Sequence, residues 1–386
     1  MSQDRIYISV CGEGLGHSSR ALAVAEELGN RGCEVFLGSY GYAYDYLKSQ
    51  KLCKVIKIPK EWEMKGEMGK FDTTKTFFAT LKLLLTKYRT LINREKKIME
   101  NNRITCVISD GRIAPIMASS YHLGLPVLFV TNIITIKKGF LNNNILKYLL
   151  HPPLDFIGRS GVVLLDDIII PDFPPPNTIC YHLLSNRTRI KKKTSFVGPL
   201  VNKKLYNSKP VRKTKKTVLT LVGGHEYRKP LIDCISKTAK LNKDINFIVI
   251  SRLIEKEKKI ENLNLLPFVK DVFSYIKASD LVIAQAGHST TMELICSGKK
   301  GILIPDKGQF EQEAIANRVK ELKLFETITY SKLSPKILMN KIETLLKDSK
   351  YKRNTMKLSK MAKRLDGPKK VTDMALNYSS RMSIKY

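Results

Sequence analysis

The chain has few cysteines, and their spacing excludes the usual cysteine-based sites. Seven occur among 386 residues, an odd number. None belongs to a Cys-x-x-Cys pair, and they are scattered along the chain as Cys11, Cys33, Cys53, Cys106, Cys180, Cys234 and Cys296. We therefore expect reduced, mostly buried thiols, with neither a zinc site nor a disulfide framework built from them.

Long uncharged apolar runs are also missing. No such run approaches the ~20 residues needed to span a bilayer. The first residues, MSQDRIYISVCGEG, lack the basic-then-apolar pattern of a signal region. We expect the protein to stay in the cytoplasm, with peripheral contact to the inner face of the membrane left open.

Acidic residues are scarce relative to basic ones. The 67 Lys and Arg against 35 Asp and Glu give a net charge of +32, with local concentrations at 187–193 and 209–216. Solvated lysine-rich faces explain such an excess, and attraction to anionic phospholipid is the next interpretation. Nucleic acid is disfavoured, because the basic runs lack interleaved aromatic residues and no nucleic-acid-binding motif is present.

The length predicts two domains. In the first half, β-rich runs at 5–10, 33–37, 54–58, 104–109 and 126–130 alternate with helical stretches, which indicates a doubly wound parallel sheet. The run 217–222 opens a second α/β unit after a basic linker that ends at Lys216. We expect α/β domains at 1–200 and 201–365, and a helical tail, 366–386, that crosses back to the first domain after a break at Gly367-Pro368.

Two apolar segments flanked by lysines stand apart from this pattern. One is a long helix expected at 74–100, and the other is the run 140–150. Buried core helices explain both, and a patch lying in a membrane interface is the alternative. The proline-rich segment 171–176 cannot be regular structure, because consecutive prolines remove amide donors and fix φ.

The stretch 281–317 predicts a ligand site. An apolar run at 281–284 reads as a buried strand, a helix should start within 286–290, and a second strand should follow at 301–305. Gly287 lets the backbone approach a ligand, and the unpaired first amides of a helix favour phosphate. Glu293, more than one turn further on, can accept hydrogen bonds from the two vicinal hydroxyls of a ribose.

Two further small-residue turns follow predicted strands. After the strand 5–10 comes Cys-Gly-Glu-Gly-Leu-Gly-His, which ends at His17 and leads into a helix expected at 20–31. Its glycine spacing is not that of the dinucleotide-binding fingerprint. After the strand 217–222 come Gly223, Gly224 and His225.

These motifs together resemble those of a known family. The order of residues in the second half is similar to the nucleotide-sugar signature of the B-fold (GT-B) glycosyltransferases. Within them it resembles the MurG-like family, whose bacterial enzyme adds N-acetylglucosamine to the undecaprenyl-linked peptidoglycan precursor. The matching positions are Gly287, Ser289, Thr290, Glu293, Gly298, Pro305, Gln312 and Asn317, with weaker support from Gly14, Leu15, Gly16 and His17.

The resemblance implies two Rossmann-like domains facing across a cleft, with the donor in the second domain. The diphosphate would meet Gly223, Gly224 and His225 on one side, and Gly287, His288, Ser289 and Thr290 on the other. Glu293 would hold the ribose, and Gln309, Glu311 and Gln312 would hold the sugar. His288 would assist at the diphosphate, but it does not correspond to the phosphate-contacting His of plant and animal relatives, because that His stands where this chain has Gln285.

The resemblance places the chemistry in the first domain. Gly14, Gly16, His17 and Ser18 would form the acceptor-binding loop. His17 is the first candidate for the base that removes the acceptor proton, since histidine titrates near neutral pH. Asp110, at the end of another strand, is the second candidate, either as the base or as the group that orients His17. Fixed amides would receive the charge of the leaving diphosphate, so we expect no metal or other cofactor.

The expected function is therefore an inverting glycosyltransferase that moves N-acetylglucosamine or another hexose from a UDP-sugar to a lipid or lipid-linked hydroxyl. Three alternatives stay open: a UDP-sugar 2-epimerase-like enzyme, a nucleotide-sugar-binding protein without turnover, and, on charge alone, a nucleic-acid glycosyltransferase. The sequence names neither the sugar nor the acceptor, and it leaves the oligomeric state undetermined.

Overall fold

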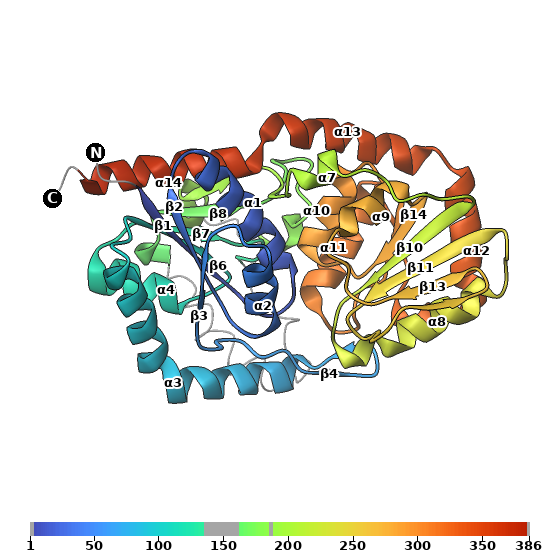
Figure 1. Cartoon of the computed structure of the whole chain (residues 1–386), viewed down its shortest axis with the longest axis horizontal. Helices are drawn as coiled ribbons and strands as arrows, with labels where there is room; N and C mark the ends of the chain where they lie inside the picture. Colours follow the sequence, from blue (N-terminus) through green and yellow to red (C-terminus); the bar gives the residue numbers. More distant parts are fainter. Residues whose placement is uncertain (1–3, 135–161, 185–187, 384–386) are drawn as a thin grey trace.

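The computed structural model describes residues 4–134, 162–184 and 188–383. It contains two seven-stranded sheets, one in each half of the chain (Figure 1). The first sheet is parallel throughout, in the order β3-β2-β1-β6-β7-β8-β9. Its strands are β1 (Arg5–Val10), β2 (Glu34–Ser39), β3 (Lys54–Lys57), β6 (Cys106–Asp110), β7 (Val127–Val130), β8 (Asp167–Ile170) and β9 (Thr194–Phe196).

The second sheet has the order β12-β13-β11-β10-β14-β15-β16, and only the edge strand β12 runs antiparallel to its neighbour. Its strands are β10 (Lys216–Val222), β11 (Ile245–Ser251), β12 (Lys258–Ile260), β13 (Leu263–Leu266), β14 (Leu281–Ala284), β15 (Gly301–Leu303) and β16 (Glu326–Thr327). The two doubly wound α/β domains expected from the sequence are thus confirmed.

Helices cover both faces of each sheet. In the N-terminal half they are α1 (Gly16–Asn30), α2 (Gly41–Ser49), α3 (Thr73–Asn101), α4 (Ala114–Ile116), α6 (Thr188–Lys192) and a π-helix at Met117–Leu123. In the rest of the chain they are α7 (Lys204–Asn207), α8 (Lys229–Ala239), α9 (Val272–Ala278), α10 (His288–Cys296), α11 (Phe310–Glu321), α12 (Pro335–Lys347), α13 (Lys350–Leu365) and α14 (Gly367–Ser383).

Burial on both faces explains why the strands read as unbroken apolar runs. Along β1, Tyr7 packs into one hydrophobic cluster, while Ile6 and Ile8 point to the opposite face and pack into another. That second face is covered partly by α14, which contributes Val371 and Ala375.

Each sheet has one topological switch point, where the connections from a central strand lead to neighbours on its opposite sides. The chain leaves β1 toward β2 on one side and returns to β6 on the other, and β10 has β11 and β14 on its two sides in the same way. Crevices at the carboxyl ends of such strands are where open α/β sheets bind ligands. Asp110, the last residue of β6, and His17, in the helix that follows the turn after β1, lie there, as do Gly223 and Gly287 in the turns after β10 and β14.

The start of α1 differs from the sequence expectation. The helix begins at Gly16, four residues before the expected Arg20. His17 therefore lies in the first helical turn, on the same face as Arg20, since residues three apart are neighbours on a helix.

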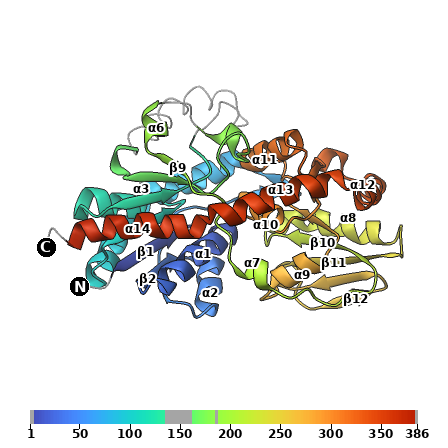
Figure 2. The same ribbon diagram turned by 90° about the horizontal axis from the view of Figure 1, so that it is seen from above.

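The C-terminal helices run along both domains (Figure 2). The expected break falls at Asp366, which adopts a left-handed conformation, φ 44°. α14 then packs on α1 and β6, and Ser379 Oγ donates to the Asp4 carboxylate at 2.5 Å.

The long helix α3 has two different halves. Its second half buries Leu91, Ile98 and Met99 in the core, whereas its first half leaves Phe78 49% and Leu85 76% exposed. The core interpretation is thus correct for the second half only. The run 140–150 lies outside the described residues. Within the described ranges, no helix combines the length and apolarity needed to cross a membrane.

A buried charge network fixes the turn after β6. Arg112 is fully buried and pairs with Glu95 and, at 3.0 Å, with Glu61. Glu61 also accepts the amides of Ile113 and Ala114. Because unpaired buried charges are costly, these contacts favour one conformation of the segment that follows Asp110.

Candidate active site

A cleft with a cavity of about 640 Å³ lies between the two domains. Residues 12–17, 19 and 20 and parts of the segment 40–46 line it from the N-terminal side, and parts of the segments 221–228, 250–252 and 284–293 line it from the C-terminal side. Ser18, expected in the acceptor-binding loop, is fully buried and is not among the lining residues. The cavity therefore joins both switch points in one space.

His17, Asp110 and Arg20 form a hydrogen-bonded group on the N-terminal wall. Asp110 Oδ1 lies 2.8 Å from His17 Nδ1, and Arg20 Nε donates to Asp110 Oδ2 at 2.6 Å, while its Nη2 donates to Oδ1. Asp110 is buried, whereas the His17 side chain is 29% exposed to the cleft. His17 and Asp110, the first and second candidates for the base, are hydrogen-bonded to each other, an arrangement that suits the alternative in which Asp110 orients His17. Arg20 is a partner that sequence reasoning missed.

The charges of this group determine which nitrogen of His17 can act. Burial opposes ionisation of Asp110, but Arg20 and His17 outweigh it and lower the pKa of Asp110 to about 2. Two groups approach His17 Nδ1, the Asp110 carboxylate at 2.8 Å and Arg20 Nη2 at 2.9 Å. Because an ionised carboxylate only accepts hydrogen bonds and Arg20 Nη2 already donates to Asp110, we assign the proton of His17 to Nδ1, which donates to Asp110. The lone pair of His17 is then on Nε2, and the hydrogen bond to Asp110 fixes the orientation of the ring.

The two glycines of the loop after β10 let its backbone lie close to the side chains of Arg228 and Arg252. A Cβ on Gly223 would lie 2.0 Å from Arg228 Nη1, and one on Gly224 would lie 3.2 Å from the Arg252 side chain. The Gly223 amide donates to Gln285 Oε1 at 3.1 Å. This amide, expected to face the diphosphate, is thus already bonded, and the amides of Gly224 and His225 remain the candidates in this loop.

Positive charge beside this loop comes from Arg228 and Arg252, and not from His225. Arg228 is buried against Asp306, whose charge outweighs burial and raises the pKa of Arg228. Burial and then the nearby Arg228 lower the pKa of His225 to about 4, so its imidazole is neutral at pH 7. Its ring stacks on Tyr227 with 5.4 Å between the centroids.

The start of α10 forms the other wall. Gly287, the N-cap residue, is half-buried, and a Cβ added there would have no atom within 4 Å. The first amides of this helix lack intrahelical acceptors and carry partial positive charge, which favours an anion. A diphosphate between α10, Gly224 and Arg228 would therefore lie opposite His17.

Comparison with known proteins identifies the family. Residues 217–371 match the glycosyltransferase family 28 C-terminal domain. An uncharacterized glycosyltransferase of Methanosarcina mazei is 33% identical over 382 residues, which cover 96% of this chain and 97% of that protein. The chain belongs to glycosyltransferase family 28.

One further sequence relative and one solved structure are similar to this family 28 glycosyltransferase. The UDP-N-acetylglucosamine--N-acetylmuramyl-(pentapeptide) pyrophosphoryl-undecaprenol N-acetylglucosamine transferase of Sulfurihydrogenibium is 30% identical over 199 residues, covering 48% of this chain and 55% of that enzyme. The solved glycosyltransferase of kitacinnamycin has a TM-score of 0.73 at 13% identity, covering 98% and 100% of the two chains. The fold is thus GT-B, as expected.

Glu293 of this glycosyltransferase is buried and contacts the opposite domain. Ser19 Oγ donates to Glu293 Oε1 at 2.6 Å. Burial raises the pKa of Glu293 to about 7, and the Ser19 hydrogen bond opposes that shift only in part. The carboxyl still lines the cavity, so a ribose there would compete with Ser19.

Ser289 and His288 join the domains as well. Ser289 Oγ donates to the Gly16 carbonyl at 2.9 Å, and both Ser289 and Thr290 line the cavity. His288 is buried, with Nε2 3.3 Å from Asp172 Oδ2. His288 is also among the lining residues of the cavity, so its expected contact with a diphosphate stays a prediction beside this pairing with Asp172, in the irregular proline-rich segment.

The three residues expected to hold the sugar are hydrogen-bonded to other groups of the protein. Gln309 is the N-cap of α11 and accepts the Gln312 amide at 2.6 Å. Gln312 is buried and holds Asp306 through both ends of its carboxamide, at 2.9 and 3.0 Å. Glu311 accepts from Asn132 of the other domain at 2.7 Å. All three line the cavity, so their contact with the sugar stays a prediction; Gln312 in addition fixes the preceding loop through its bonds to Asp306.

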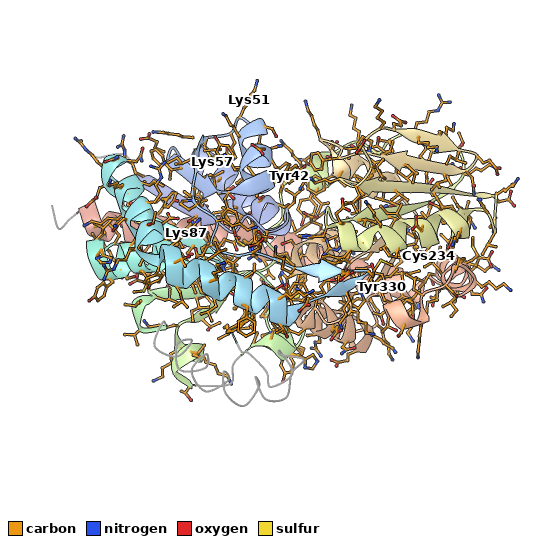
Figure 3. All side chains as sticks on the ribbon, turned by 90° about the horizontal axis from the view of Figure 1, so that it is seen from below. Tyr42, Lys51, Lys57, Lys87, Cys234 and Tyr330 are labelled. Atoms are coloured by element: carbon orange, nitrogen blue, oxygen red, sulfur yellow. The ribbon has the colours of Figure 1, made fainter. Side chains whose placement is uncertain are left out.

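An aromatic contact spans one end of the cleft. The Arg252 guanidinium lies 3.0 Å from the centroid of the Tyr42 ring, and Phe268 meets Tyr42 and Tyr46 edge-on. Tyr42 lies at the junction of the domains (Figure 3). Stacked guanidinium and aromatic groups of this kind stabilise the approach of the two walls.

One group of possible metal ligands occurs among the described residues, formed by Asp172, Cys180 and His288 within 4.8 Å of one another. Asp172 already accepts the amides of Ile179 and Cys180. Burial, then the Asp172 charge, raises the pKa of the Cys180 thiol well above its usual value. A protonated thiol and a carboxylate bonded to amides fit a structural junction better than a metal site.

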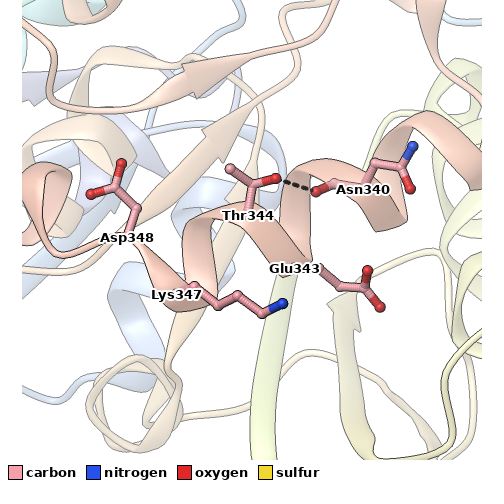
Figure 4. Close-up of a pocket in the computed structure, with 5 residues that line it drawn as sticks. All are labelled: Asn340, Glu343, Thr344, Lys347 and Asp348. Carbon is pink, nitrogen blue, oxygen red and sulfur yellow. Dashed lines mark hydrogen bonds between the residues drawn. The ribbon is translucent and has the colours of Figure 1, made fainter.

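A second hollow, of about 540 Å³, opens on the surface beside α12 (Figure 4). Its lining comes from Asn340, Glu343, Thr344, Lys347 and Asp348. The Thr344 hydroxyl donates to its own helix, at the Asn340 carbonyl. No groups from separate elements converge there, so the interdomain cleft is the candidate active site.

The raised pKa of Glu293 predicts a pH effect on stability. A carboxyl whose pKa rises from 4.5 unfolded to about 7 folded stabilises the fold fully below pH 4.5 and loses that contribution as the pH rises through 7. The loss amounts to about 3 kcal/mol. The free energy of unfolding of the wild type and of Glu293→Gln should be measured by denaturant unfolding from pH 4.5 to 8. The free energy of the wild type should fall relative to that of Glu293→Gln across this window. Two free energies that change in parallel with pH would contradict the raised pKa of Glu293.

Proposed function

We propose that this family 28 glycosyltransferase transfers N-acetylglucosamine or another hexose, with inversion, from a UDP-sugar to a hydroxyl of a lipid or lipid-linked acceptor. The observation that carries the proposal is the position of His17. It is held by Asp110 on one wall of the cleft, and it faces a helix start and Arg228 on the other.

The geometry supports a direct displacement. His17 Nε2 accepts the proton of the acceptor hydroxyl as that oxygen attacks the anomeric carbon. The bond from this carbon to the UDP oxygen breaks, and the electron pair leaves on the diphosphate. One attack from the face opposite the leaving group inverts the anomeric centre.

The leaving diphosphate would be stabilised by fixed groups of the chain. These are the first amides of α10, the amides of Gly224 and His225, and the Arg228 guanidinium. They supply positive charge without a metal, so we propose that none is required.

The exposed half of α3 supports a lipid acceptor. Phe78 and Leu85 are exposed, and the neighbouring side chains include Lys75, Lys82 and Lys87. Figure 3 shows Lys87 on this helix. Apolar side chains among lysines suit the interface of an anionic membrane, because both the apolar and the charged contacts are then satisfied. This supports a peripheral position at the inner face of the membrane.

His17→Ala should lower kcat by about 10² to 10⁴ and leave UDP affinity within twofold, because the base acts in the transition state and not on the nucleotide. Asp110→Asn should also lower kcat, since Nδ1 would lose its carboxylate. His122→Ala, at an exposed histidine outside the cleft, is the matched control.

The measurement is the rate of UDP release from a UDP-hexose, with a lipid extract as acceptor and product analysis. Unchanged rates in His17→Ala and Asp110→Asn would refute the assignment of these residues. Release of a free 2-epimer instead of a glycoside would identify the epimerase alternative.

The membrane contact makes a separate prediction. The double variant Phe78→Ser, Leu85→Ser should lose most of its cosedimentation with vesicles containing anionic phospholipid, because it lacks the apolar contacts. Leu241→Ser removes a side chain that is 51% exposed on the other domain, and it should bind vesicles like the wild type. Equal loss in both variants, or none in either, would contradict the assignment of this surface.

A further inference from the structure

A small hairpin of the N-terminal domain lies on the C-terminal domain. Its strands are β4 (Gly66–Glu67) and β5 (Lys70–Phe71), and Figure 1 shows β4 beneath the second domain. Phe71 N–H donates to the Lys307 carbonyl at 2.8 Å, and Lys307 N–H donates to the Gly69 carbonyl at 3.2 Å. The hairpin is therefore paired, backbone to backbone, with residue 307 of the other domain.

Residue 307 belongs to the loop between β15 and α11, here called the sugar loop (residues 306–309). The loop is held internally by Gln312, which bonds Asp306, and by the Gln309 cap of α11. On its outer side Asp306 pairs with Arg228. The hairpin thus adds a contact to the sugar loop from the domain that carries His17.

Two glycines make this docking possible. A Cβ on Gly69, whose φ is +75°, would lie 2.8 Å from the Tyr330 ring. A Cβ on Gly66 would lie 2.7 Å from the Tyr227 ring and 2.8 Å from the Lys70 carbonyl. Neither position has room for a side chain, so the hairpin approaches the second domain closely only with glycine at both.

We infer that the hairpin formed by residues 66–71 is a positioning element that fixes the sugar loop for recognition of the donor sugar. This rests on the proposed function. A sugar is distinguished by one or two hydrogen bonds, so a small shift of the loop changes the discrimination. Pairing with Lys307 limits such shifts, and it makes the sugar specificity of the C-terminal domain depend on a segment of the N-terminal domain.

The hairpin also connects the sugar loop to α3. Asp72, the residue after β5, caps α3 by accepting the Lys75 amide at 2.8 Å, and Asp72 N–H donates to the Lys65 carbonyl at 2.9 Å. The hairpin tip exposes Met68, at 77%. Only Asp72 separates α3 from β5 of the hairpin. An acceptor surface that contacts α3 would therefore touch a helix directly connected to the hairpin that holds the sugar loop.

The test uses Gly69→Ala and, as an independent second variant, Gly66→Ala. The matched control for Gly69→Ala is Gly32→Ala, whose φ is +80° and whose Cβ would meet no atom within 4 Å. The control has the same backbone strain without the clash against another domain. Two measurements are made on each protein in full length: hydrogen exchange of the amides at 306–312, and calorimetric binding of UDP, UDP-glucose and UDP-N-acetylglucosamine.

We expect the hairpin variants to exchange the sugar-loop amides at least about tenfold faster and to bind UDP within twofold of the wild type. Their ratio of affinities for the two UDP-sugars should move toward one by about tenfold. The control should match the wild type. Unchanged exchange would show that the hairpin does not position the loop, and faster exchange with an unchanged ratio would remove its role in sugar recognition. A wild type that does not bind UDP would overturn the proposed function itself, and with it the sugar role of the hairpin.

Discussion

The rest of the structure depends on the opposition of two sheet edges. Each domain is a doubly wound sheet with one switch point, and the turns at the two switch points face each other across the cleft. In the proposed reaction, this arrangement would let the first domain supply the proton acceptor and the second the positive charge. Each turn consists of ordinary residues, and the site arises because the two domains bring the turns face to face.

Hydrogen bonds hold the two edges close together. Ser19 bonds Glu293, Ser289 bonds the Gly16 carbonyl, and His288 approaches Asp172. Two of these three pairs use side chains at the start of α10, the same helix end that would receive the diphosphate. Donor entry would therefore exchange contacts between the domains for contacts with the nucleotide, and Glu293 is the residue where the two compete most directly.

The sequence predicted the elements well, because apolar runs and small-residue turns mark buried strands and their ends. The strand at 281–284 followed from such patterns, whereas the roles expected of His17 and Asp110 came from the family resemblance, which left open whether Asp110 is the base or orients His17. Contacts between distant segments were not predictable. Arg20 was missed because the helix was expected to begin there, which hid its position one turn from His17. His288 and Gln312 were expected at the ligand, but Asp172 and Asp306, which no local pattern places beside them, are their partners.

The central claim is that the cleft binds a UDP-sugar between the two switch points. Calorimetry of the wild type with UDP, ADP, GDP and NAD tests it most directly. We expect UDP to bind at least about tenfold more tightly than the other nucleotides, and Glu293→Gln to weaken UDP binding through the ribose. Binding of ADP or NAD without measurable binding of UDP would contradict the account.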